Sequence, residues 1–332
     1  MLCQQSRAIL KTMKILKFLA IGIGLFAAIL LLLLYEGDIP VDVVDAKYGS
    51  PSSQFMTLEN GTRIHYRDEG NRHGVPIVLI HGFGASLHTW TSWVEFLGDD
   101  YRVITLDLPA HGLTGAAPDG DYSTHAYVGA IKNVVDHLKL TTFSMGGNSM
   151  GGDVAWHFAL AYPDALDNMI LVNATGLNSW KNEANKPLIF DLLANDWFRS
   201  IASMLDPYYL IEQAVQTAYN HTDVVTDDLI LRYYHMAMRK GSREAIITRS
   251  STQASTQESA VATAEQLSSI QTPTLVMWGR NDALIDVSVA HLFEATLPNV
   301  TLIIYDEVGH VPMEEIPERS AADVKDFLQR TR

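Results

Sequence analysis

The pattern of apolar and polar positions divides the chain into three parts. Residues 15–35 are almost continuously apolar. Residues 55–177 and 272–332 alternate short apolar, β-branched runs with segments of helical spacing, whereas residues 178–271 show helical spacing alone. Short apolar runs alternating with helices are typical of a mostly parallel sheet with helices on both faces. We therefore predict an α/β core from 55–177 and 272–332, with a helical cap inserted at 178–271.

The elements of this core follow from the same pattern. A hairpin is expected at 55–67, turning at Asn60-Gly61, a dipeptide that favours tight β-turns. Further strands are predicted at 76–80, 101–106, 142–145, 169–172, 274–278 and 301–305. Core helices are predicted at 87–96, 124–138, 153–162, 288–295 and 320–330. Cap helices are predicted at 188–193, 197–205, 211–219 and 227–240.

The apolar segment near the N-terminus predicts a transmembrane anchor at 15–35. Residues 18–34 carry no polar side chain, and a helix of this length spans roughly 27 to 30 Å, close to a bilayer core. A cleaved signal peptide is the alternative, but its apolar region is usually about 7 to 15 residues and ends in a small-x-small site. This segment ends instead in leucines and Tyr35.

The charges on either side of this segment predict its orientation. Basic residues precede it and acidic residues follow it: Arg7, Lys11, Lys14 and Lys17, then Glu36, Asp38, Asp42 and Asp45. By the positive-inside rule, residues 1–14 form a cytosolic tail, residues 36–54 a spacer, and the catalytic domain lies on the outer side of the membrane, in the periplasm of a bacterium.

Composition removes several function classes. The chain has 332 residues and a formal charge of −14, with 38 acidic and 24 basic residues, which argues against a nucleic-acid partner. Cys3 is the only cysteine, so neither an intramolecular disulfide nor a paired-cysteine metal motif is possible. The 12 histidines show no metal-ligand spacing, and we expect no metal and no cofactor.

The pentapeptide at 147–151, Gly-Asn-Ser-Met-Gly, is the strongest chemical signal. It lies between a predicted strand and a predicted helix, the place of the nucleophile elbow of a serine hydrolase. Such an elbow is a strained turn that leaves no room for side chains two residues before or after the serine. Ser149 is therefore the candidate nucleophile, and a turn serine without chemistry is the alternative.

A base and an acid follow Ser149 in the expected order. His310 comes just after the strand at 301–305, and Asp282 just after the strand at 274–278. Carboxyl ends of parallel strands lie at one edge of the sheet, so the three residues are expected to converge. His310 would take the serine proton and Asp282 would orient the imidazole. Asp306 is a weaker rival for the acid.

The oxyanion of the reaction needs two backbone N–H donors. One is expected from Met150, directly after the nucleophile. The other is expected from Phe83, in the His81-Gly82-Phe83-Gly84 loop after the strand at 76–80. His81 is expected to brace this loop, and Asp107 and His111 to shape a neighbouring loop rather than to react.

Five motifs in this order resemble the α/β-hydrolase fold superfamily. They are His-Gly-Phe-Gly at 81–84, Asp-Leu-Pro-Ala-His-Gly at 107–112, Gly-Asn-Ser-Met-Gly-Gly at 147–152, Trp-Gly-Arg-Asn-Asp at 278–282 and Gly-His-Val-Pro-Met-Glu at 309–314. The resemblance covers roughly residues 56–328. The third and fifth motifs are similar to those of bacterial lipases and esterases, membrane-anchored ones included, which implies a carboxylic ester hydrolase. A domain anchored beside a bilayer, with an aromatic cap, favours a small-molecule apolar substrate such as a medium-chain or lipid-like ester.

Two other functions stay open at this point. The third motif also occurs in carbon–carbon bond hydrolases of aromatic degradation, which would need a cationic cap residue, such as Arg232, Arg239 or Arg243, facing Ser149. A non-catalytic binding protein on the same fold is the other alternative. The aromatic cap is expected to contribute an apolar acyl pocket. The physiological substrate and the oligomeric state do not follow from the sequence.

Overall fold

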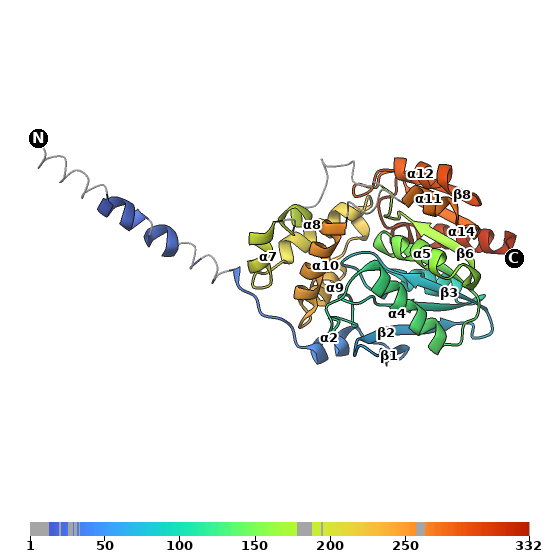
Figure 1. The fold of residues 1–332 in the computed structure, drawn as a ribbon, viewed down its shortest axis with the longest axis horizontal. Helices are drawn as coiled ribbons and strands as arrows, with labels where there is room; N and C mark the ends of the chain where they lie inside the picture. The colour runs from blue at the N-terminus through green and yellow to red at the C-terminus, as the bar shows by residue number, and fades with distance from the viewer. Residues whose placement is uncertain are drawn as a thin grey trace, which may run out of the picture.

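The protein is built around an eight-stranded, mostly parallel sheet in the order β1-β2-β4-β3-β5-β6-β7-β8 (Figure 1). This computed structural model describes residues 13–19, 21–25, 29, 32, 34–177, 188–193, 195–256 and 263–331. The strands are β1 Ser53–Thr57, β2 Arg63–Gly70, β3 Val75–Ile80, β4 Tyr101–Leu106, β5 Phe143–Asn148, β6 Leu166–Val172, β7 Thr274–Gly279 and β8 Val300–Tyr305. β2 runs antiparallel to β1 and β4, and the other neighbouring pairs are parallel. The predicted α/β fold is confirmed.

Both faces of the sheet are covered, which explains the continuous apolar runs of its central strands. Alternate residues of β3 point to opposite faces: Val78 and Ile80 pack with α4 and α5, and Ile77 and Leu79 pack with α3. The core helices are α3 Thr91–Leu97, α4 Thr124–His137, α5 Met150–Ala161, α12 Ser288–Thr296, α13 Pro312–Glu315 and α14 Pro317–Arg330, with a 3₁₀ turn, η1, at Leu87–Trp90.

The segment between β6 and β7 forms the helices α6 Leu188–Leu193, α7 Asp196–Ala202, α8 Tyr208–Ala218, α9 Asp227–Met238, α10 Ser242–Thr256 and α11 Thr263–Ser268. The helices α7 to α10 lie together beside one end of the sheet, whereas α11 packs against the core helices α5 and α12 (Figure 1). Thr226 caps α9 by accepting a hydrogen bond from the Leu229 amide at 3.2 Å. The helix α10 is absent from the predicted elements, because its serines and threonines are poor helix formers and hide the pattern.

Residues 36–54, expected to be a spacer, include a docked helix, α2 Val41–Tyr48. Its Val44 is only 1% exposed and packs with Leu113 of the core and Met236 of the cap. The proline and acid content predicted a spacer, whereas one buried valine and several ion pairs hold the segment in place.

The described residues do not support the transmembrane anchor predicted at 15–35. No helix within the described ranges is both long and apolar enough to cross a membrane. Residues 20, 26–28, 30, 31 and 33 of the predicted anchor lie outside those ranges, as does most of the predicted tail at 1–14.

Candidate active site

Ser149 occupies a strained turn between β5 and α5. Its backbone has φ +54° and ψ −119°, a conformation that side-chain-bearing residues rarely adopt. The flanking glycines are required by close packing. A Cβ on Gly147 would lie 2.1 Å from the Gly151 carbonyl oxygen, and one on Gly151 would lie 2.2 Å from the Ile80 carbonyl oxygen. The turn therefore holds Ser149 at the carboxyl edge of the sheet, where the pattern predicted it.

His310 and Asp282 form a buried pair next to this turn. His310 Nδ1 lies 2.7 Å from Asp282 Oδ2, and the two side chains are 7% and 0% exposed. Asp282 Oδ1 accepts hydrogen bonds from the amides of Leu284 and Ile285, at 2.8 and 3.0 Å. A carboxylate held in this way orients the imidazole with its proton on Nδ1, which leaves Nε2 as the basic nitrogen.

Three polar side chains that the sequence motifs did not single out for this role hold the pair in place. Asn173 donates to Asp282 Oδ2 at 2.7 Å, and Asn148 donates to the His310 carbonyl oxygen at 3.0 Å. The Glu315 carboxylate accepts the Gly309 amide at 2.8 Å. Asn148 ends β5 and Asn173 follows β6, so their place at strand ends was the available signal.

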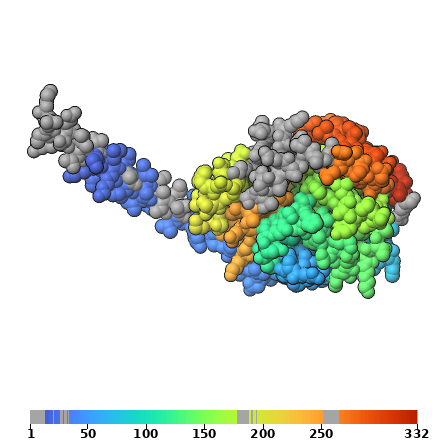
Figure 2. Space-filling view, viewed as in Figure 1, coloured from blue at the N-terminus to red at the C-terminus, as the bar shows by residue number. Residues whose placement is uncertain are grey.

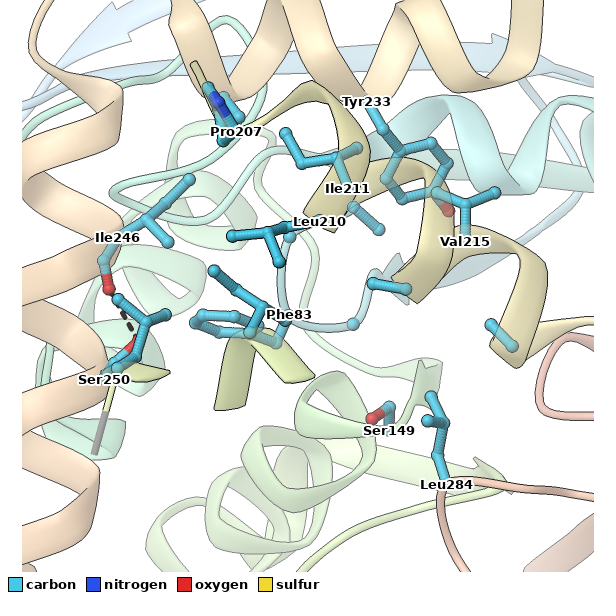
Figure 3. A pocket seen from close by; sticks show the side chains of 18 of the residues that line it. Phe83, Ser149, Pro207, Leu210, Ile211, Val215, Tyr233, Ile246, Ser250 and Leu284 are labelled. Atoms are coloured by element: carbon cyan, nitrogen blue, oxygen red, sulfur yellow. Dashed lines mark hydrogen bonds between the residues drawn. The ribbon is translucent and has the colours of Figure 1, made fainter. Parts of the chain in front are cut away.

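The loop after β3 lies directly against the nucleophile. A Cβ on Gly82 would lie 3.1 Å from Ser149 Cβ, so this loop and the elbow are in van der Waals contact. Phe83 of the loop, Ser149 and Met150 all line one cavity (Figure 3). Met150 opens α5, and the first amides of a helix have no partner within it, which suits an anionic oxygen.

Buried side chains brace this loop. His81 Nε2 accepts the Leu108 amide at 3.0 Å, so its Nδ1 donates to the Gly82 carbonyl oxygen at 2.7 Å. Burial lowers the pKa of His81 and keeps the ring neutral. Burial also lowers the pKa of His111, to about 3. Asp107 accepts the Leu87 amide at 2.7 Å.

The cavity above Ser149 measures about 650 Å³ and lies between core and cap. Its volume is within the range of small-molecule sites, about 300 to 1,000 Å³. Figure 3 shows Ser149 at one end and Pro207 at the other, with Phe83 and Leu210 between them. Apolar side chains from α8 and α10, including Ile211 and Ile246, dominate the walls. Within the described residues, no three His, Cys, Asp or Glu side chains are placed to hold a metal ion.

The fold, the elbow and the buried His–Asp pair together define an α/β-hydrolase. The model of the alpha/beta hydrolase fold family matches residues 75–317, and the chain belongs to this family. The protein is accordingly a hydrolase of this fold.

The names of the relatives point to different hydrolysis reactions. The chain is 26% identical over 283 residues to Lipase 1 of Psychrobacter immobilis, covering 82% of each protein. It is 27% identical over 292 residues to 2-hydroxy-6-oxo-6-phenylhexa-2,4-dienoate hydrolase of Burkholderia cepacia, covering 84% of this chain and 97% of that one. The fold is similar to that of a membrane phospholipase A described as a bacterial virulence factor, with a TM-score of 0.71, 22% identity, and 98% and 99% of the two chains covered.

Proposed function

We propose that this protein is a serine hydrolase that cleaves carboxylic esters with an apolar acyl group. The observation that carries the proposal is the arrangement at one cavity end: Ser149 on a strained turn, with the buried His310–Asp282 pair beside it. The lipase relatives are consistent with this reaction.

In the proposed reaction, Ser149 Oγ attacks the ester carbonyl carbon while His310 Nε2 accepts the hydroxyl proton. The Phe83 and Met150 amides donate hydrogen bonds to the oxyanion that forms. When the carbon–oxygen bond breaks, His310 returns the proton to the leaving alcohol and the acyl group stays on Ser149. Water then attacks the acyl-enzyme by the same route, which releases the acid and regenerates the serine.

The contacts of the cap arginines favour ester cleavage over carbon–carbon cleavage. A carbon–carbon bond hydrolase of the kind considered above needs a cation facing the nucleophile to hold the substrate carboxylate. The three arginines considered for this part are each paired with a carboxylate: Arg232 with Glu314 at 3.4 Å, Arg239 with Asp45 at 3.0 Å and Arg243 with Asp38 at 2.6 Å. Arg243 also lines the cavity, but Asp38 balances its charge. The apolar walls of the cavity instead suit an acyl chain.

The proposal is tested with the full chain on p-nitrophenyl esters of graded acyl length and, in parallel, on a vinylogous diketone acid. Ester turnover that is lost in Ser149→Ala supports it, and turnover of the diketone acid alone would replace it by carbon–carbon hydrolysis. A fluorophosphonate probe separates the third alternative, because a non-catalytic binding protein leaves Ser149 unlabelled.

A further inference from the structure

A segment that precedes the hydrolase core packs along the cap and is hydrogen-bonded to it. We call residues 34–48 the N-terminal strap. Its backbone pairs with two turns of the cap, through the bridges Tyr35 to Leu205 and Ile39 to Arg239. The pairing is made by four hydrogen bonds: Asp206 N to Leu34 O at 2.7 Å, Glu36 N to Met204 O at 3.1 Å, Ile39 N to Met238 O at 2.8 Å and Lys240 N to Ile39 O at 2.8 Å.

Side chains add to this attachment. Arg243, on α10, donates to the Glu36 carbonyl oxygen at 3.0 Å and to Asp38 Oδ1 at 2.6 Å. Arg239 donates to Asp45 at 3.0 Å. Figure 2 shows the blue strap lying against the yellow and orange surface of the cap. The strap and the cap are therefore held as one unit, although the family match begins only at residue 75.

One residue of the strap, Leu34, contributes to the lining of the cavity, together with Leu205, Asp206 and Pro207 of the cap. Leu34 is 44% exposed, so it lies where the cavity meets the surface. The Leu34 carbonyl oxygen accepts a hydrogen bond from the amide of Asp206, the residue next to Pro207. Pro207 lies at the end of the cavity away from Ser149 (Figure 3). A linear acyl chain attached at Ser149 and laid along Phe83 and Leu210 points to this end.

We propose that Leu34 forms the distal wall of the acyl site, so that the strap determines which acyl chain lengths the enzyme accepts. This inference rests on the proposed ester hydrolysis. Its physical basis is that each methylene group buried in an apolar site strengthens binding by about fourfold, whereas one that meets a wall gains nothing or clashes. The position of Leu34 then sets the chain length at which the gain stops.

The test compares Leu34→Trp and Leu34→Ala in the full chain, with monomeric p-nitrophenyl esters from butanoyl to hexadecanoyl. In Leu34→Trp, the ratio of kcat/KM for the dodecanoyl ester to kcat/KM for the butanoyl ester is expected to fall on the order of tenfold. The reason is that about two methylene groups of the longer chain would no longer be buried. In Leu34→Ala, the preferred length is expected to move to longer chains. Tyr35→Ala is the matched control. Tyr35 pairs with the same turn of the cap but is not among the residues that line the cavity, so the chain-length profile of this variant should match wild type.

Opposite shifts in the two Leu34 variants support the wall, and unchanged ratios in both overturn it even if the wild type hydrolyses esters well. A shift of the same size in Tyr35→Ala also overturns it, since the effect would then come from the strap backbone. Circular dichroism identifies a Leu34→Trp protein that does not fold, in which case Leu34→Ala decides. If the wild type hydrolyses no ester, the proposed function fails by itself, and the same variants are compared for displacement of a fluorescent fatty acid by saturated acids of graded length.

Discussion

Two histidine–aspartate pairs of the same geometry lie in the core, one at the cavity and one beneath the edge of the sheet. His310 Nδ1 lies 2.7 Å from Asp282 Oδ2, and His65 Nδ1 lies 2.7 Å from Asp107 Oδ2. The second pair even has a serine on its other side, because His65 Nε2 is 2.8 Å from Ser53 Oγ. Both regions therefore contain a serine, a histidine and a carboxylate, and in the second region hydrogen bonds join all three.

The surroundings of the two serines differ. Ser53 begins the regular strand β1, its histidine is fully buried, and neither residue lines the cavity above Ser149. Ser149 lies on a turn with positive φ, at the start of a helix and at the end of that cavity. The comparison teaches that a hydrogen-bonded serine, histidine and aspartate do not by themselves make a catalytic site. We expect catalysis to need a nucleophile elbow, oxyanion donors and room for a substrate as well.

The largest effect that tests this comparison is the loss of the nucleophile. Ser149→Ala is expected to lower kcat for esters by at least about 10⁴-fold and to abolish fluorophosphonate labelling, because the variant lacks the hydroxyl that would form the acyl-enzyme. Ser53→Ala is the matched control and should keep wild-type labelling and kcat. Labelling that persists in Ser149→Ala but disappears in Ser53→Ala would reverse the assignment of the two regions.

The two carboxylates provide the next test. Asp282→Asn is expected to lower kcat by about 10⁴-fold, because an amide favours the wrong tautomer of His310. Asp107→Asn is expected to act on stability instead, by about 3 to 5 kcal/mol, since the amide leaves buried donors of the fold unpaired. Kinetics and urea unfolding of both variants separate the two effects. Equal losses of kcat per folded molecule would show that the pairs are not distinct.

The candidate catalytic residues were largely predictable, whereas the residues that line the cavity were not. Ser149, Asp282 and His310 follow strand ends, and the close approaches at Gly147 and Gly151 leave a readable glycine spacing. The structure brings all three to one place, with Phe83 and Met150 beside them. The positions of the strands along the chain were predictable from their apolar runs, because burial on both faces of the sheet constrains the sequence strongly.

The parts that were missed depend on contacts between distant segments. Leu34 lies in an apolar run that predicts a membrane helix, and nothing in that run indicates that its last leucine reaches the cavity of a domain beyond it. The hydrogen-bonded Ser53, His65 and Asp107 were missed because Ser53 and His65 occur in no motif. The three residues meet only through the pairing of β2 with β1 on one side and with β4 on the other. Local sequence patterns do not indicate such contacts between residues that are far apart in the sequence.

A smaller effect is expected in the pH dependence of stability, from a buried histidine in the loop that follows Asp107. His111 is 2% exposed, and burial lowers its pKa to about 3. Between about pH 6.5 and pH 3 the unfolded chain binds a proton at this histidine that the folded protein does not, so stability is lost as pH falls. We expect this site to cost about 2 kcal/mol between pH 7 and pH 5, measured by urea unfolding. His111→Asn, whose amide is able to donate to the Pro109 carbonyl in place of the ring, should remove that part of the pH dependence; parallel curves for both proteins would contradict it.

The smallest effect is expected from Ser53→Ala on stability. Ser53 Oγ lies 2.8 Å from His65 Nε2 and accepts the Ser50 amide at 3.0 Å, so its removal leaves a buried ring nitrogen unpaired. The expected loss is about 1 kcal/mol, the usual net value of such a hydrogen bond, and Ser53→Thr should restore part of it because the hydroxyl is kept. Thermal unfolding measures both variants. A loss of ester turnover in Ser53→Ala without loss of stability would mean that Ser53, His65 and Asp107 take part in the reaction. A loss of stability with unchanged turnover would mean instead that they stabilise the fold. The same three residue types then have a structural role where they lie away from a substrate cavity.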